Sequence, residues 1–447
     1  MGRPRGLFRA APSAVGGWLR RILALRDTSD VSDRNDTPEE SQRAFVSAPH
    51  LAAVQPVYDL CVVGLGAHGV RIAARAAAGT MNVACSDSRA DAIARFNRAD
   101  VGNDDTLVEA IEDALAGQVV RAFAGAARAR AFVITTGPDL RADGSVDTRP
   151  IEAAIDAVVD TIEEGNLVVL DASSPPGTTR RILADRLEAV GMRPGEDVFV
   201  ASACVHDERC VVGGVTRACS EHAAALYRAL FDVPVRTATA EACELVRLAH
   251  RTHQEMNTAF ANEISAVCKH LGLDVWSVLS LTRESGSTSL GSPTPGPLDA
   301  GARIEPRLLA DACQHDTMLT RATLSLGDMQ PARIVAEIRA AARRFVSPTI
   351  ACLGLTSGSD GGLLHSPAMR VATLIARESL GQLVVVDPGL SASPLPGAPL
   401  VGLSEALRRA DIVVVLSDDP SFAAAPRELY ARPSVIDTLG VLAQAPT

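Results

Sequence analysis

The sequence predicts an α/β protein with two Rossmann-like, doubly wound domains joined by a central helical region that contains one long helix. Short apolar runs rich in β-branched residues alternate with helical patterns toward both ends of the chain. A glycine-rich turn follows the first of these runs, and residues 239–271 keep apolar residues at helical spacing with no Gly or Pro. The expected division is an extension over 1–56, a domain over 57–238, a central region over 239–345 and a domain over 346–447.

The first apolar run leads into a glycine pattern that fits dinucleotide binding. Residues 59–69 read Asp-Leu-Cys-Val-Val-Gly-Leu-Gly-Ala-His-Gly. In this pattern Gly64 permits a tight turn, Gly66 lets backbone N–H groups approach a pyrophosphate, and Gly69 lets the following helix pack on the strand. An ordinary strand-to-helix turn would explain the glycines alone, but the strand, helix, second strand and acid follow in the order that a dinucleotide site requires. We therefore predict an NAD site.

Asp87 ends the predicted second strand. At that place a carboxylate accepts hydrogen bonds from a ribose diol and repels the 2′-phosphate of NADP. The sequence therefore predicts a preference for NAD over NADP.

Further elements continue the alternation. In the first domain we expect helices over 106–116 and 150–163 and strands over 132–136, 167–171, 198–202 and 233–237. After the long helix, a loop with four prolines over 293–306 precedes helices over 318–326 and 331–344. The last domain should contain strands over 349–354, 383–387, 412–417 and 434–437.

Composition excludes several classes of function. The 43 basic and 53 acidic residues give a net charge of -10, which argues against general nucleic-acid binding. The nine cysteines occur singly, without CxxC or paired metal-ligand spacing, so we expect no metal site and a reducing, cytoplasmic location. His250 and His253 lie three residues apart near Glu244, but a solvated helix face explains them better than a metal site.

The extension is basic and then acidic. Six arginines precede any acid, and an acidic, polar stretch follows over 27–40. We expect a flexible tail, or a true translation start further along the chain. A weak membrane-surface contact through Trp18, Leu19, Ile22 and Leu23 is the alternative. No transmembrane segment is predicted.

Several motifs in a fixed order resemble the UDP-glucose/GDP-mannose dehydrogenase family, and the bacterial UDP-N-acetylmannosamine dehydrogenases in particular. The resemblance covers the chain from about residue 58 to its end. The motifs are Val-Val-Gly-Leu-Gly at 62–66, Ser-Ser-Pro-Pro-Gly-Thr-Thr at 173–179, Asn-Thr-Ala-Phe-Ala-Asn-Glu at 257–263, Ile-Ala-Cys-Leu-Gly-Leu at 350–355 and Ile-Asp-Thr-Leu-Gly at 436–440.

This resemblance implies an NAD-dependent, four-electron oxidation of a nucleotide sugar for surface-polysaccharide synthesis by a homodimer. In the family a cysteine thiolate captures the intermediate aldehyde, which would otherwise escape before the second oxidation. A lysine and an asparagine on the long helix stabilise the oxyanion, and a loop glutamate assists proton transfer. The resemblance also places the hydroxyl of Ser173 near the nicotinamide.

The chain departs from the family where the chemistry should be. Gly301 takes the place of the cysteine, and Arg247 and Arg251 take the places of the lysine and the asparagine. The glutamate loop is missing after Cys204. Two cations expected near the sugar nucleotide are replaced by Gly358 and Leu364. Cys313 lies twelve positions beyond Gly301, where we expect a buried structural cysteine.

Two hypotheses follow from these departures. The first is an NAD-binding homologue with impaired or lost catalysis, which acts as a structural or regulatory partner. The alternative is an active oxidoreductase with a rebuilt site, limited to one hydride transfer or acting on a different substrate. In either case Arg247 and Arg251 are the candidate catalytic residues, and Gly64, Gly66, Gly69, Asp87 and Ser173 are the candidate cofactor-binding residues.

Overall fold

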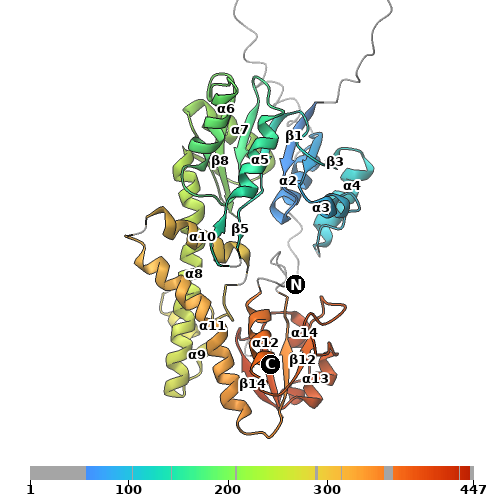
Figure 1. The fold of residues 1–447 in the computed structure, drawn as a ribbon, viewed down its shortest axis with the longest axis vertical. Helices are drawn as coiled ribbons and strands as arrows, with labels where there is room; N and C mark the ends of the chain where they lie inside the picture. Colours follow the sequence, from blue (N-terminus) through green and yellow to red (C-terminus); the bar gives the residue numbers. More distant parts are fainter. Residues whose placement is uncertain are drawn as a thin grey trace, which may run out of the picture. The chain divides into compact units, whose positions relative to one another are not determined.

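The computed structural model describes residues 57–102, 104–141, 143–206, 209–286, 290–297, 299–313, 315–356, 366–431 and 433–442 (Figure 1). The extension expected over 1–56 lies outside the described residues. The chain divides into two compact units. One comprises Met1–Pro138 and Thr148–Glu244, and the other comprises Asp139–Asp147 and Leu245–Thr447.

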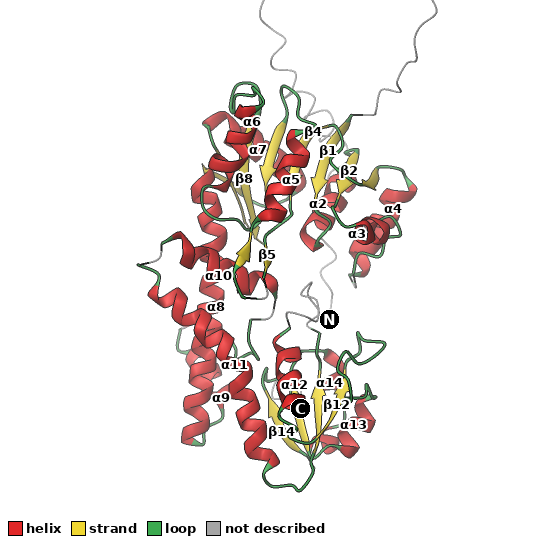
Figure 2. Ribbon diagram, in the orientation of Figure 1, coloured by secondary structure: helices red, strands yellow, loops and turns green. Residues whose placement is uncertain are grey.

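The first unit is built on an eight-stranded sheet in the order β10-β9-β8-β7-β4-β1-β2-β3 (Figure 2). Its strands are β1 (Tyr58–Val63), β2 (Val83–Ser86), β3 (Val120–Phe123), β4 (Ala129–Ile134), β7 (Leu167–Leu170), β8 (Phe199–His206), β9 (Arg209–Gly214) and β10 (Val235–Thr239). Neighbouring strands are parallel except β8 and β9, which pair antiparallel. The chain proceeds outward from β1 in both directions, so the order reverses between β1 and β4. Such a switch point is where doubly wound sheets bind ligands.

Helices cover both faces of this sheet because alternate residues of β1 point to opposite faces. Leu60 and Val62 pack in one apolar cluster with α2 (Ala67–Ala78), α4 (Asp105–Ala116) and α7 (Arg217–Leu230). Cys61 and Val63 pack in another with α5 (Arg149–Val159) and α6 (Asp185–Ala189), which follows a π-helical segment over Thr179–Ala184. The short helix α3 (Ala90–Phe96) follows β2.

The second unit begins with the long helix α8 (Ala240–Leu271), which starts at the end of the first unit. It continues through α9 (Val275–Glu284), α10 (Ala300–Ala312) and α11 (Met318–Ala342). A two-stranded hairpin of β5 (Asp139–Leu140) and β6 (Val146–Asp147) also belongs to this unit. Leu140 and Val146 of the hairpin pack against Leu248, Ile304 and Leu308, so a segment from the middle of the first domain's sequence completes a small core beside α10.

A four-stranded parallel sheet in the order β12-β11-β13-β14 closes the chain. Its elements are β11 (Thr349–Leu353), α12 (Pro367–Arg377), β12 (Gln382–Val386), α13 (Leu403–Arg409), β13 (Ile412–Val415), α14 (Pro420–Ala424), a 3-10 helix over Arg427–Tyr430 and β14 (Ser434–Asp437). Helices α11 and α12 pack on one face and α13 and α14 on the other. The α/β class with two Rossmann-like domains is therefore confirmed.

Two details of the central region correct the sequence prediction. The helices expected over 318–326 and 331–344 are one helix, α11, with Pro331 inside it. An internal proline costs about 3 kcal/mol, but burial of Ile334, Val335 and Ile338 in the last domain's core offsets that cost. The expected loop over 293–306 turns into helix α10 at Ala300, because the Asp299 side chain accepts a hydrogen bond from the N–H of Ala302 and caps it.

In the part of the chain that the structure describes, none of the helices combines the length and the apolar character that crossing a bilayer requires.

Candidate functional site

Two of the three fingerprint glycines are required by the packing of the protein itself. Gly64 has φ +113°, and its N–H donates to the carbonyl of Ser86 at 2.7 Å. A Cβ on Gly64 would lie 2.7 Å from the Thr136 Oγ1 atom, and a Cβ on Gly69 would lie 2.0 Å from the Gly64 carbonyl oxygen. Any larger residue at either position would therefore push apart the end of β1, the start of α2 and the segment that follows β4.

Gly66 differs from the other two. It is the N-cap of α2, with the extended conformation φ -72° and ψ 172°, and a Cβ there would meet no atom within 4 Å. The fold would thus accept a side chain at this position. A ligand that lies directly against the backbone would leave no room for a side chain at this position. The N–H groups at the start of α2 suit the pyrophosphate of a dinucleotide. The residues present therefore fit the cofactor.

Asp87 lies at the end of β2, as predicted, and holds the turn as well. Its carboxylate accepts hydrogen bonds from the N–H of Leu65 at 2.8 Å and from the N–H and Nε of Arg89 at 2.9 and 3.0 Å. Burial favours a higher pKa for Asp87, but the bonds from Arg89 and Leu65 outweigh it and lower the pKa. Because the Arg89 cation partly offsets repulsion of a 2′-phosphate, the preference for NAD over NADP stays a prediction.

Ser173 follows β7 at the carboxyl edge of the sheet and begins a loop fixed from the long helix. Glu244 in the first turns of α8 is 4% exposed and accepts hydrogen bonds from the N–H groups of Gly177 and Thr179 at 2.5 and 2.7 Å. Burial raises the pKa of Glu244, although these bonds oppose the rise. Sequence reasoning considered Glu244 only beside possible metal ligands and missed this positioning role, which depends on contacts about 65 residues apart.

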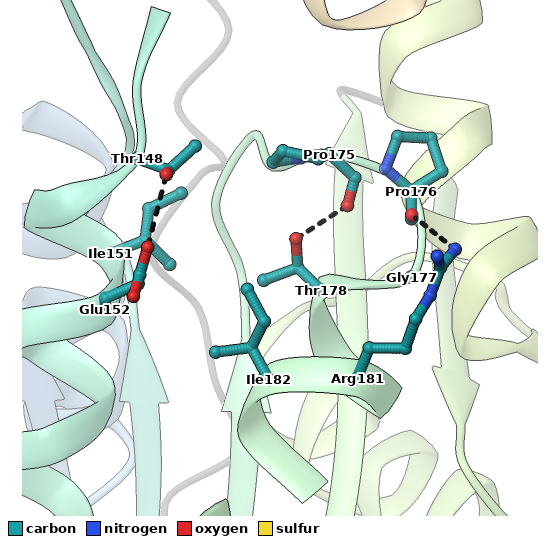
Figure 3. Close-up of a pocket in the computed structure, with 9 residues that line it drawn as sticks. All are labelled: Thr148, Ile151, Glu152, Pro175, Pro176, Gly177, Thr178, Arg181 and Ile182. Carbon is teal, nitrogen blue, oxygen red and sulfur yellow. Dashed lines mark hydrogen bonds between the residues drawn. The ribbon is translucent and has the colours of Figure 1, made fainter. Parts of the chain in front are cut away.

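A pocket lies between this loop and the start of α5 (Figure 3). It is lined by Thr148, Ile151, Glu152, Pro175, Pro176, Gly177, Thr178, Arg181 and Ile182. The Thr178 hydroxyl donates to the Pro175 carbonyl at 2.7 Å, and the Arg181 guanidinium donates to the Pro176 carbonyl at 3.3 Å. The two consecutive prolines of the loop are thus held by side chains that follow them in the chain.

In the second unit, Gly301 lies in the first turn of α10 among charged groups. A Cβ on Gly301 would lie 3.2 Å from the Asp299 Oδ1 atom and 3.6 Å from the Glu305 Oε2 atom. Arg251 forms an ion pair with Asp299, and its Nε atom lies 3.8 Å from Glu305 Oε2. Burial disfavours the charged guanidinium, but Asp299 together with Glu255 and Glu305 outweighs burial and raises the pKa of Arg251. Arg251 is therefore a fixed cation that cannot exchange a proton.

Glu255, one turn after Arg251 on α8, completes this charged group. Burial raises its pKa to about 7, with Asp299 and Glu305 contributing to the rise and Arg251 opposing it. A carboxyl group with this pKa can exchange a proton near neutral pH. Arg247 lies one turn before Arg251 on α8 and is half-buried.

Other candidates from the sequence have different outcomes. Strands β8 and β9 pair with His206 opposite Arg209, and the absence of the family glutamate loop stays a prediction. Cys313, expected to be buried, is exposed at the end of α10, because the helix ends there and the residue lies beyond the core. Gly358 and Leu364 lie outside the described residues. His250 and His253 are exposed, and no cluster suited to a metal ion occurs among the described residues.

The fold and the fingerprint define a dinucleotide-dependent dehydrogenase architecture, and comparison with known proteins gives the family. Residues 58–231 match the NAD-binding domain of the UDP-glucose/GDP-mannose dehydrogenase family, and residues 241–323 match its central domain. The chain belongs to this family, and NAD is the cofactor of its first domain.

Relatives extend the match over most of the chain. It is 30% identical to an NDP-N-acetyl-D-galactosaminuronic acid dehydrogenase of Ralstonia nicotianae over 86% of this chain and 96% of the relative. It is 28% identical to a UDP-N-acetyl-D-mannosamine dehydrogenase of Salmonella typhi over 86% and 98%. A UDP-D-ManNAc dehydrogenase structure from Pyrococcus horikoshii shares the fold with a TM-score of 0.76 and 23% identity, over 87% of this chain and 97% of that one.

The contrast between the glycines predicts two separate effects. Gly66→Ala should leave the thermal unfolding temperature within about 2 °C of the unchanged protein while weakening NADH binding by tenfold or more, because only the ligand needs that space. Gly69→Ala should lower the free energy of unfolding by about 2 kcal/mol or more through the 2.0 Å contact with Gly64. Calorimetry measures the thermal unfolding, and NADH fluorescence titration measures the affinity for the cofactor. Equal destabilisation by the two substitutions would contradict this assignment.

The charges around Gly301 predict that a restored thiol would be unreactive. Gly301→Cys places the thiol beside Asp299 and Glu305, whose negative charges disfavour the thiolate. Adding Asp299→Asn, which keeps the helix cap, should speed alkylation by iodoacetamide about tenfold at neutral pH. The measurement uses a Cys313→Ser background to remove the exposed thiol. Equal alkylation rates with and without Asp299→Asn would show that these carboxylates do not control the reactivity of a thiol at position 301.

Proposed function

We propose that this chain binds NAD in the cytoplasm but does not carry out the thiol-dependent double oxidation of a nucleotide sugar. It acts instead as a structural or regulatory partner in surface-polysaccharide synthesis. The observation that carries the proposal is the pairing of Arg251 with Asp299 beside Gly301. Relatives whose names specify dehydrogenases of N-acetylated sugar nucleotides support a nucleotide sugar as the class of ligand.

The residues at and around Gly301 oppose the family reaction at two steps. Without a thiol at Gly301, no thioester can form there, so the aldehyde has no covalent intermediate from which to lose its second hydride. The Arg251 cation is already neutralised by Asp299, with Glu305 nearby, so little positive charge remains for a developing oxyanion. An arginine also cannot accept the proton of an alcohol.

One observation favours the alternative of an active enzyme with a rebuilt site. Glu255 has a pKa raised to about 7 by burial, and it lines a small pocket with Thr258, Asn262, Gly296 and Pro297 among others. A carboxylate there could accept the proton of a substrate alcohol during a single hydride transfer. This alternative stops at the aldehyde level because it supplies no nucleophile for the second step.

The test is NADH stoichiometry with UDP-N-acetylmannosamine, UDP-glucose and GDP-mannose. We expect no uronic acid and no more than one NADH per sugar. One NADH per sugar, lost on Glu255→Gln, would favour the alternative. Two NADH per sugar, unaffected by thiol alkylation, would overturn both readings because another group would then perform the aldehyde step.

We further propose that the chain forms a homodimer through α8. Phe260, Val267 and Leu271 are 51%, 53% and 62% exposed, and their spacing of seven and four residues places them on one side of that helix. An apolar stripe of this kind is costly in water, and an isologous contact with a second copy would cover it.

Substitution on the stripe should separate the dimer. Phe260→Asp with Val267→Asp places two charges on the apolar side and should convert a dimer to a monomer in light scattering at micromolar concentration. Ala266→Asp is the matched control, since Ala266 is exposed on a different side of α8 and should leave the dimer intact. If the protein without substitutions is a monomer in light scattering, the proposal is refuted.

A further inference from the structure

The dinucleotide loop carries a histidine that the NAD fingerprint does not require. His68 is the second residue of α2, between Gly66 and Gly69. Its Nε2 atom lies 2.9 Å from the Oδ2 atom of Asp171, but off the direction of a hydrogen bond. Its side chain is 29% exposed, so the imidazole spans from a buried carboxylate to the surface of the loop.

Asp171 is fully buried directly after β7, and the hydroxyl of Tyr227 on α7 donates to the same Oδ2 atom at 2.6 Å. Tyr227 is itself fully buried. A buried carboxylate is costly unless hydrogen bonds and a cation compensate its charge. Tyr227 supplies a hydrogen bond, and a protonated His68 would supply the cation. The three side chains come from α2, the residue after β7, and α7, so the fold brings them together from distant parts of the sequence.

Other charged groups near this loop are accounted for. Asp87 at the end of β2 is occupied by Leu65 and Arg89. Arg71 and Arg75 lie further along α2, and Asp104 at the start of α4 interacts electrostatically with Arg71. Asp171 is in direct contact with the imidazole.

We propose that His68, held by Asp171 and Tyr227, is a cation that strengthens binding of the NAD pyrophosphate and makes that binding depend on pH. His68 belongs to the first turn of α2, where a pyrophosphate binds. The Asp171 carboxylate lies beside Nε2 and attracts the protonated ring, which leaves the other ring N–H for the ligand side. The proposal concerns cofactor binding alone and stands whether or not the chain oxidises a sugar.

The sign of the effect follows from linkage. A dianionic pyrophosphate favours the protonated imidazole, so the ligand should bind more tightly at low pH than at high pH. Removing the imidazole should weaken binding at low pH and have little effect at high pH.

The experiment is fluorescence titration of NADH against the full-length protein at about pH 6 and about pH 8. We expect the unchanged protein to bind about tenfold more weakly at the higher pH, and His68→Gln to bind weakly at both. Asp171→Asn should reduce the pH dependence without removing the ring. His222→Gln is the matched control, because His222 lies on α7 in the same unit, stacked on Phe199, and should leave the profile unchanged.

ADP-ribose is the second probe, since it keeps the pyrophosphate and lacks the nicotinamide. It should show the same dependence on pH and on His68. Dependence for NADH but not for ADP-ribose would overturn the assignment to the pyrophosphate. If His68→Gln binds NADH with the unchanged affinity and pH profile, the proposal is wrong. If Asp171→Asn does not fold, the His68→Gln variant still tests the proposal, because the His68 side chain is partly exposed and its substitution disturbs the core less.

Discussion

A carboxylate at the end of the second strand fastens the turn after the first strand in both Rossmann-like domains. Asp87 accepts from the N–H of Leu65 at 2.8 Å, and Asp387 accepts from the N–H of Leu355 at 2.7 Å. In each case a glycine with positive φ precedes the turn, Gly64 at +113° and Gly354 at +82°. Each bond joins two neighbouring parallel strands and orders the chain that follows. In the first domain, the direction of α2 and the open backbone at Gly66 depend on it.

In the second unit, charged side chains of both signs surround Gly301. Arg251 has carboxylates on two sides, Asp299 and Glu305, and Glu255 lies in the same group. Two carboxylates face the single cation Arg251, so this group leaves no net positive charge for an anion. Simple replacement of Gly301 by a nucleophile would therefore meet the wrong electrostatics, because a thiolate needs a cation nearby.

The sequence predicted the features that depend on local pattern. Gly64, Gly66, Gly69 and Asp87 follow strands recognisable from their apolar runs, and the long helix has uninterrupted helical spacing. The start of α10 also had a local signal, the capping residue Asp299, which the neighbouring prolines obscured. Contacts between distant segments had no local signal in the sequence. The hairpin of β5 and β6 joins the second unit through packing on Leu248, and Asp171 meets Tyr227 across 56 residues.

Not every glycine of the fingerprint is evidence for a bound cofactor. Gly64 and Gly69 would collide with the protein's own atoms if they carried a Cβ, and Asp87 holds the turn through Leu65. These three residues would be needed for the fold even in a protein that had lost its ligand. Gly66 has no such structural reason, because the space beside it is open. A chain that kept only the scaffold could carry a residue with a side chain there at no steric cost. The glycine at position 66 is therefore the residue that connects this fold to a bound dinucleotide.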